Sequence, residues 1–272
     1  MKNQSPINLF CKYVVCSRIG IILRRAFPKL YIFLKIRSDS IREPEMELLP
    51  RLCDKSKISI DVGVLWGSYT YLLAKYSEFC YSFEPNPIII PFLKKNFCNK
   101  NVRIIPKALS DSEKITKLRV PDIYGHSTIE PENKLEDENY VEYNVETDKL
   151  DNYGFEKVGF IKIDVEGHEP SVLKGMKNIL SIEKPFLFIE VSKKHNQKSI
   201  EFVSQFMVKN GYSAFYYKNG FLHDVSQIDK SLSKINNISS NIIFCHNKKI
   251  NQISDLINSN DYNIGIMESK II

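Results

Sequence analysis

The sequence has no long apolar run. Its N-terminal apolar stretch, residues 19–23, is followed at once by Arg24 and Arg25. A helix that crosses a bilayer needs about 20 mostly apolar residues, so no transmembrane helix is expected. The same two arginines interrupt the apolar region that a secretory signal peptide requires.

Paired cysteines are also lacking. The six cysteines, at positions 11, 16, 53, 80, 98 and 245, include no C-x-x-C pair and no spacing typical of a metal site. This pattern predicts reduced thiols and a cytoplasmic protein rather than a disulfide framework. No metal site is assigned from these residues.

Acidic residues are missing from the first 38 positions, which carry eight lysines and arginines. The whole chain has a net charge of +6, so the remaining residues carry −2. The basic character therefore belongs to one segment, and general nucleic-acid binding is not expected. Residues 7–36 predict one or two amphipathic helices, broken near Pro28.

Two interpretations of this segment, residues 1–44, stay open. It is a helical cap over the catalytic face, or a basic helix that lies on an anionic membrane surface. The second interpretation predicts peripheral contact with the inner face of the membrane.

A strand, a glycine turn and a helix follow one another in residues 58–75. The apolar run 58–62 contains Asp61 and ends at Gly63, and Gly67 lies four residues later, before a helix. In doubly wound sheets this arrangement binds nucleotide-type cofactors, because glycines let the backbone approach the ligand. We assign Asp61, Gly63, Gly67, Tyr69 and Thr70 to cofactor binding.

A second strand ends at Glu84, within the stretch FEPNP of residues 83–87. Glu84 lies 23 residues beyond Asp61, close to the roughly 20 expected for an acid that binds ribose hydroxyls. A nicotinamide motif needs glycine at positions 65 and 68, where this chain has leucine and serine. The pattern instead indicates S-adenosylmethionine (SAM), with Glu84 and Asn86 as further ligands.

The rest of the chain predicts an α/β protein with a Rossmann-like, doubly wound and mainly parallel sheet. Further strands are expected at 101–105, 159–164, 186–191, 214–217 and 241–245, with helices at 87–99, 169–180 and 198–209. Residues 106–150 predict an antiparallel insertion whose segment 125–128 approaches the cofactor. Residues 45–247 form the catalytic domain, and 248–272 a helical or frayed tail.

Four ionisable groups lie within six residues at the end of the fourth strand, in DVEGHE of residues 164–169. Capping of the next helix explains Glu169. It does not explain Asp164, whose carboxylate ends a buried strand. We predict that Asp164, Glu166 and His168 are catalytic; oxygen ligands of this kind also suit a divalent cation, and the spacing does not decide this.

Five separated motifs resemble the FkbM family of SAM-dependent methyltransferases. They are DVGVLWGSYT (61–70), FEPNP (83–87), ALSD (108–111), TDKLDNY (147–153) and FIKIDVEGHEPSVLKG (160–175). The resemblance covers about residues 45–215 in the same order. The family usually has Ala-Asn where this chain has Val64-Leu65, a change that removes one polar group from the cofactor turn.

The resemblance implies an O-methyltransferase that modifies a hydroxyl of a sugar, glycan or secondary metabolite. The residues by themselves indicate an α/β enzyme with a nucleotide-type cofactor. The alternative is a non-catalytic binding or scaffold protein of the same fold at a membrane surface. The expected partner is a small-molecule or glycan acceptor; the oligomeric state is not readable.

Overall fold

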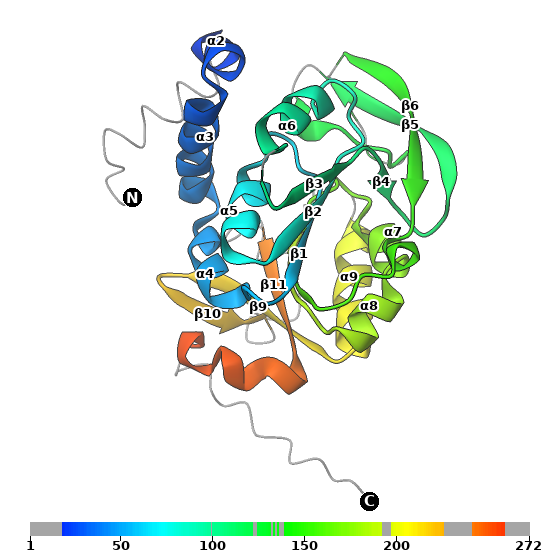
Figure 1. Cartoon of the computed structure of the whole chain (residues 1–272). Helices are drawn as coiled ribbons and strands as arrows, with labels where there is room; N and C mark the ends of the chain where they lie inside the picture. The colour runs from blue at the N-terminus through cyan, green and yellow to red at the C-terminus, as the bar shows by residue number, and fades with distance from the viewer. Residues whose placement is uncertain are drawn as a thin grey trace, which may run out of the picture.

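The structure is a computed structural model. It describes residues 18–98, 100–121, 124–131, 133, 135, 139–191, 197–225 and 241–258. The strands of its main sheet follow the order β10-β9-β11-β8-β7-β1-β2-β3 (Figure 1). In chain order they are β1 (Ile58–Val62), β2 (Phe79–Phe83), β3 (Val102–Ile105), β7 (Val158–Ile163), β8 (Phe186–Glu190), β9 (Tyr212–Lys218), β10 (Phe221–Asp224) and β11 (Asn241–His246).

Five neighbouring strands of this sheet are parallel, and β11 runs antiparallel to both β8 and β9. All six residues of β7 are buried, as expected for a parallel strand covered on both faces. The expected mainly parallel α/β sheet is confirmed. The strand order reverses at β1 and β7, which is where ligands bind in open α/β sheets.

The insertion forms a second sheet of β4 (Ala108–Leu109), β5 (Lys114–Pro121) and β6 (Tyr140–Asp148). β5 and β6 pair antiparallel over eight residue pairs. The short turn η2 (Tyr124–His126) belongs to the insertion and faces the cofactor turn. A Cβ built on Gly125 would lie 3.8 Å from Cδ2 of Leu65.

Helices cover both faces of the main sheet. On one face are α7 (Glu169–Lys174), α8 (Lys177–Ile182) and α9 (Gln197–Lys209). On the other are η1 (Pro44–Leu48), α4 (Leu49–Leu52), α5 (Ser68–Tyr76), α6 (Ile90–Phe97), and the turns η6 (Asn247–Gln252) and η7 (Ser254–Leu256).

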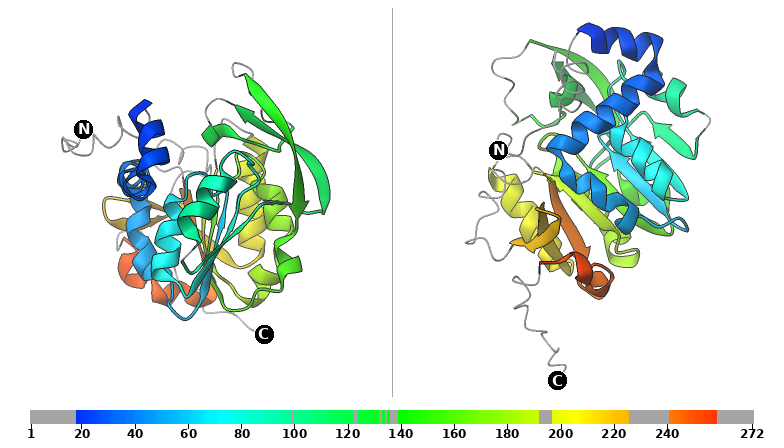
Figure 2. Two further views of the ribbon diagram at one scale, coloured as in Figure 1. Left: turned by 45° about the horizontal axis from the view of Figure 1, so that its top comes forward. Right: turned by 90° about the vertical axis from the view of Figure 1, so that its left-hand side faces the viewer.

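The N-terminal segment forms α2 (Arg18–Ala26) and α3 (Pro28–Arg42), and residues 1–17 lie outside the described part. Proline at the first position of α3 accounts for the break between the two helices. α3 lies across the outside of α5, and α2 continues beyond it (Figure 2). Among the residues that the structure describes, no helix is both long and apolar enough to cross a membrane.

Two details differ from the sequence expectations. The expected helix 169–180 is two helices, because Met176, with a φ of −131°, leaves the helical conformation; at Gly175, before it, a Cβ would lie 2.0 Å from the Ser110 carbonyl oxygen. β10 was not expected, although Asn219-Gly220, both with positive φ, is a typical hairpin turn. Residues 247–256, where a helical or frayed tail was expected to begin, form 3₁₀ turns with Ile253 and Ile257 buried, and residues 259–272 lie outside the described part.

Candidate active site

The turn after β1 is built on a close backbone contact. Gly63 has a φ of +86°, and a Cβ at this position would lie 1.7 Å from the carbonyl oxygen of Asp164. Any side chain would therefore separate the ends of β1 and β7. Gly67 also has a φ of +86°, and a Cβ there would meet the Phe97 ring at 2.7 Å. Both glycines therefore take backbone positions that a side chain would disrupt, and their contact with the cofactor stays a prediction.

Leu65 lies between these glycines with a φ of +49°, in the left-handed region that leucine rarely adopts. This conformation directs its backbone N–H to Glu84, whose Oε2 accepts a 2.9 Å hydrogen bond. The N–H of Asn86 donates to Oε1 of the same carboxylate, also at 2.9 Å. The turn thus fixes Glu84 through the backbone, whatever side chain stands at position 65.

Glu84 is 6% exposed at the end of β2. Burial raises the pKa of Glu84 to about 7, and the backbone N–H groups of Asn86, Leu65 and Val64 oppose this rise. A carboxylate has about four acceptor sites. Three backbone donors leave acceptor capacity for a hydroxyl group of a ligand.

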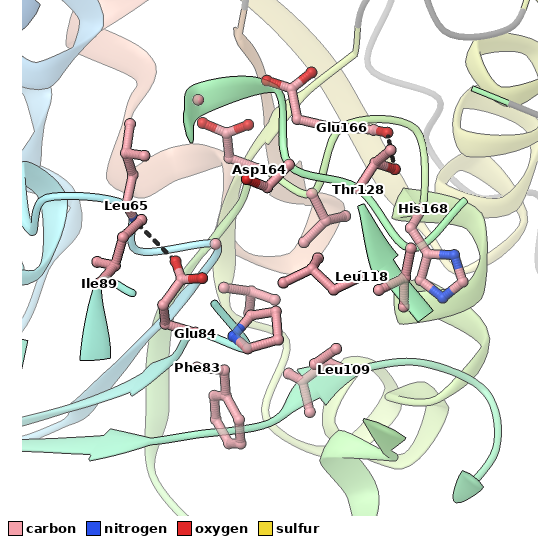
Figure 3. A pocket seen from close by; sticks show the side chains of 18 residues that line it. Leu65, Phe83, Glu84, Ile89, Leu109, Leu118, Thr128, Asp164, Glu166 and His168 are labelled. Carbon is pink, nitrogen blue, oxygen red and sulfur yellow. Dashed lines mark hydrogen bonds between the residues drawn. The ribbon is translucent and has the colours of Figure 1, made fainter. Parts of the chain in front are cut away.

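A pocket opens at the carboxyl ends of β1, β2 and β7 (Figure 3). Its cavity is about 80 Å³, and the space within its walls is about 640 Å³ when the open mouth is included. Its wall is mostly apolar, with acids at two places. It is lined by Val62, Gly63, Leu65, Phe83, Glu84, Pro85, Ile89, Ala108, Leu109, Leu118, Gly125, Ser127, Thr128, Ile129, Asp164, Val165, Glu166 and His168.

The structure brings Glu84 and the three residues predicted to be catalytic to this one pocket. Figure 3 shows Glu84 beside Leu65, and Asp164 with Glu166 on another side. The Asp164 side chain is 32% exposed and therefore reachable from the pocket.

Glu166 has a φ of +51°, and hydrogen bonds to its backbone carbonyl oxygen fix its position. That oxygen accepts hydrogen bonds from Thr128 Oγ1 at 2.9 Å and from Asn133 Nδ2 at 2.8 Å. The insertion thus fastens the loop after β7. The Glu169 carboxylate, in the first turn of α7, accepts the Gly167 N–H at 3.0 Å and so also holds this loop.

His168 has a neighbour at each ring nitrogen. Nε2 lies 2.9 Å from Ser110 Oγ, and Nδ1 lies 3.0 Å from Glu130 Oε2. Its side chain is 11% exposed. The ring is therefore held in a fixed orientation at the pocket wall, which suits a positioning role better than direct contact with an acceptor.

Behind Asp164, Lys162 occupies a buried position in β7 with 1% exposure. Its Nζ donates to Asn241 Oδ1 at 2.8 Å and lies 3.7 Å from Asp164 and 3.9 Å from Glu190. Burial would lower the pKa of Lys162, but these carboxylates and Glu43 raise it above its ordinary value. The negative charge of Asp164, and then burial, raise the pKa of Glu190 well above its usual range.

Other residues assigned to the cofactor are not among those that line the pocket. Asp61 is 1% exposed, and its Oδ2 accepts a 2.5 Å hydrogen bond from Thr70 Oγ1. The Tyr69 hydroxyl donates to Glu43 at 2.8 Å. Asn86 is fully buried, and its Oδ1 accepts the Ile88 N–H at 3.0 Å. Their assignment to the cofactor stays a prediction.

Sequence reasoning missed Lys162 and Ser110, and it placed Glu190 at a ligand-binding strand end without assigning it a role. Ser110 lies in the ALSD motif. The sequence offers no signal for Lys162, because a lysine within a nearly all-apolar strand does not indicate which residues it will contact. No group of three metal-binding side chains occurs among the residues that the structure describes.

Solved structures of methyltransferases are similar to parts of this chain, at TM-scores below 0.5. An FkbM methyltransferase of Methylobacillus flagellatus KT shares 17% identity at a TM-score of 0.46, over 89% of this chain and 58% of that one. This chain thus spans less than two thirds of that protein. SMU.1697c of Streptococcus mutans, solved with SAH, shares 13% identity at a TM-score of 0.45, over 74% and 95% of the two chains.

No curated protein sequence matches the chain. The family model of the FkbM methyltransferase domain matches residues 56–214, which is more than half of the 272 residues. That segment begins just before β1 and ends within β9, so it includes the turn, Glu84 and the Asp164–Glu169 loop. The chain belongs to the FkbM family of methyltransferases.

Proposed function

We propose that the protein is a SAM-dependent O-methyltransferase that modifies a hydroxyl of a sugar, glycan or secondary metabolite. One observation carries the proposal: Glu84 and Asp164, from two different strand ends, line the same largely apolar pocket. Family membership supplies the methyltransferase activity. The acceptor class follows from the resemblance described above.

The residues of the pocket fit SAM. Glu84 retains acceptor capacity for ribose hydroxyls, and the apolar side chains of Leu109 and Val165 suit a purine ring. When bound, SAM supplies an activated methyl group on a sulfonium.

The protein's own residues then have separate tasks. Glu84 orients the ribose, and the apolar wall excludes water. Asp164 accepts the proton of the acceptor hydroxyl, because it is the carboxylate beside Lys162 that also lines the pocket. Glu166 faces the acceptor, and His168, held by Ser110 and Glu130, positions the loop that carries both acids.

Two measurements test this function. Mass spectrometry of the purified protein reports a retained ligand, and SAM or its demethylated product is expected. A panel of sugars and other hydroxyl compounds is then incubated with methyl-labelled SAM and the protein. Label transfer to a hydroxyl oxygen supports the proposal, whereas transfer to nitrogen or carbon contradicts it.

The second candidate is a binding protein of this fold without catalysis. The apolar side chain of Leu65 in the cofactor turn favours it, since the family usually has an asparagine there. SAM binding measured by calorimetry, with no label transfer to any compound of the panel, would favour this candidate over the enzyme.

A further inference from the structure

Large apolar side chains are concentrated on the outside of the two N-terminal helices. Six of the fourteen exposed large apolar residues in the described part of the chain lie between positions 19 and 33. They are Ile19, Ile21, Ile22, Phe27, Leu30 and Phe33, with exposed fractions between 46% and 63%. We call these six residues the α2–α3 apolar face. Such a concentration usually marks an interaction site.

The same helices are fixed to the protein by their other side. Tyr31 and Ile32 are buried against Val64 and Trp66 of the cofactor turn. The Arg24 guanidinium lies 3.8 Å from the centre of the Trp66 ring. The apolar face is therefore held outward by a rigid attachment, and its exposure does not result from a loose segment.

The charge around this face has one sign. Arg25 and Lys29 are exposed beside it, and the first acid of the chain is Asp39. Asp39 is itself buried, 2.6 Å from Lys35 Nζ and 2.5 Å from Arg42. A basic helix with an apolar side is typical of segments that lie in the interface of an anionic bilayer.

We propose that the α2–α3 apolar face binds the surface of an anionic membrane, with Ile22, Phe27 and Phe33 inserted among the lipids and Arg25 and Lys29 at the headgroups. Because α3 packs on the cofactor turn, this contact holds the catalytic domain at the bilayer. If the face bound a protein instead, its apolar area alone could suffice, and no excess of positive charge around it would be needed. The eight basic residues without an acid favour lipid.

Vesicle sedimentation of the full chain tests the proposal. The vesicles are phosphatidylcholine alone, or phosphatidylcholine with 30% phosphatidylglycerol, at ~0.05 and ~0.5 M salt. We expect binding to the anionic vesicles, weakened at high salt. A truncation that removes residues 1–38 is unsuitable for this test, because it would expose the apolar side chains of Val64 and Trp66, which α3 covers.

Point variants separate the apolar contribution to membrane binding from the electrostatic one. Ile22→Gln with Phe33→Gln should lower vesicle binding at least tenfold, while Ile182→Gln with Val208→Gln, equally exposed elsewhere, should not. Arg25→Gln with Lys29→Gln should lower binding to anionic vesicles by roughly fivefold per charge. Lys177→Gln with Lys218→Gln is the matched control.

Thermal unfolding of each variant checks that the fold is intact. Three results would overturn the proposal: no binding to anionic vesicles, an equal loss in the control variants, or salt-insensitive binding. A dimer in light scattering that the Ile22/Phe33 variant dissociates, without vesicle binding, would assign the face to a second copy instead.

Discussion

The end of β7 separates two regions of different character. On one side is the pocket, which is open and largely apolar. Its carboxylate Glu84 is held by hydrogen bonds from backbone N–H groups. On the other is a closed polar cluster around Lys162 in which side chains bind one another. Asp164 belongs to both, since it lines the pocket and lies 3.7 Å from Lys162.

The cluster connects distant parts of the chain. Asn241 donates to Glu45 at 2.7 Å and to Glu43 at 3.0 Å, and accepts from Lys162. Burial raises the pKa of Glu45 to about 7. Buried ionic networks are costly to desolvate and sensitive to loss of one partner. The comparison suggests that the pocket serves binding, while the cluster holds Asp164 in position beside Lys162.

The largest expected effect tests the residue shared by the two regions. Asp164→Asn should lower kcat by roughly 10²–10⁴-fold while SAM still binds, because the proton acceptor is lost. The rate is measured as label transfer to the acceptor found in the panel. Asp151→Asn is the control: Asp151 caps α8 by accepting the N–H groups of Asn178 and Ile179, so only about 1 kcal/mol of stability should be lost. Full turnover by Asp164→Asn would refute the assignment.

The second prediction breaks the cluster. Lys162→Met should lower the free energy of unfolding by about 3 kcal/mol, because it removes the buried cation that Asn241 accepts from and that lies beside the partly exposed carboxylates of Asp164 and Glu190. Urea unfolding measures this. Lys35→Met is a matched buried lysine whose partner, Asp39, keeps Arg42 and Ser68, so its loss should be clearly smaller. Equal losses would show that the cluster has no special dependence on Lys162.

These two regions also differ in how far the sequence predicted them. Gly63, Glu84 and Asp164 follow apolar runs, and parallel strands place such residues at one edge, so their meeting in one pocket was predictable. Glu43 and Asn241 are 198 residues apart, and no local pattern indicates that they hydrogen-bond. Asp61 was assigned to the cofactor from its place in the motif, but its burial and its bond to Thr70 depend on packing.

The third prediction tests the pocket alone. Glu84→Ala should weaken SAM binding by about 2–4 kcal/mol, through loss of charge-assisted hydrogen bonds to the ribose. Calorimetric titration measures the affinity. Glu78→Ala, exposed at the other end of β2, is the control. An unchanged affinity in Glu84→Ala would remove the ribose role.

The fourth prediction concerns pH. Because the pKa of Glu45 is raised from 4.5 to about 7, the folded protein keeps a proton that the unfolded chain releases above pH 4.5. Its contribution to stability is full below about pH 4.5 and is lost as the pH rises towards 7. Glu45→Gln fixes the neutral form and keeps the acceptor for Asn241. Urea unfolding at pH 5 and pH 7 should show a smaller fall for this variant, by about 1 kcal/mol or more; an identical fall would contradict the role of Glu45.

The smallest expected effect concerns Leu65 in the turn after β1. This residue contributes to the pocket through its backbone N–H, which binds Glu84. Leu65 has a φ of +49°, a conformation that asparagine tolerates better than most residues. Leu65→Asn and Leu65→Ala both remove the apolar side chain, but only asparagine relieves the backbone strain. The asparagine variant should therefore be more stable than the alanine variant by about 1 kcal/mol in urea unfolding. Since the backbone N–H of residue 65, and not its side chain, binds Glu84, SAM affinity should differ little between the two variants. A much higher affinity in Leu65→Asn alone would mean that the side chain at this position also reaches the cofactor.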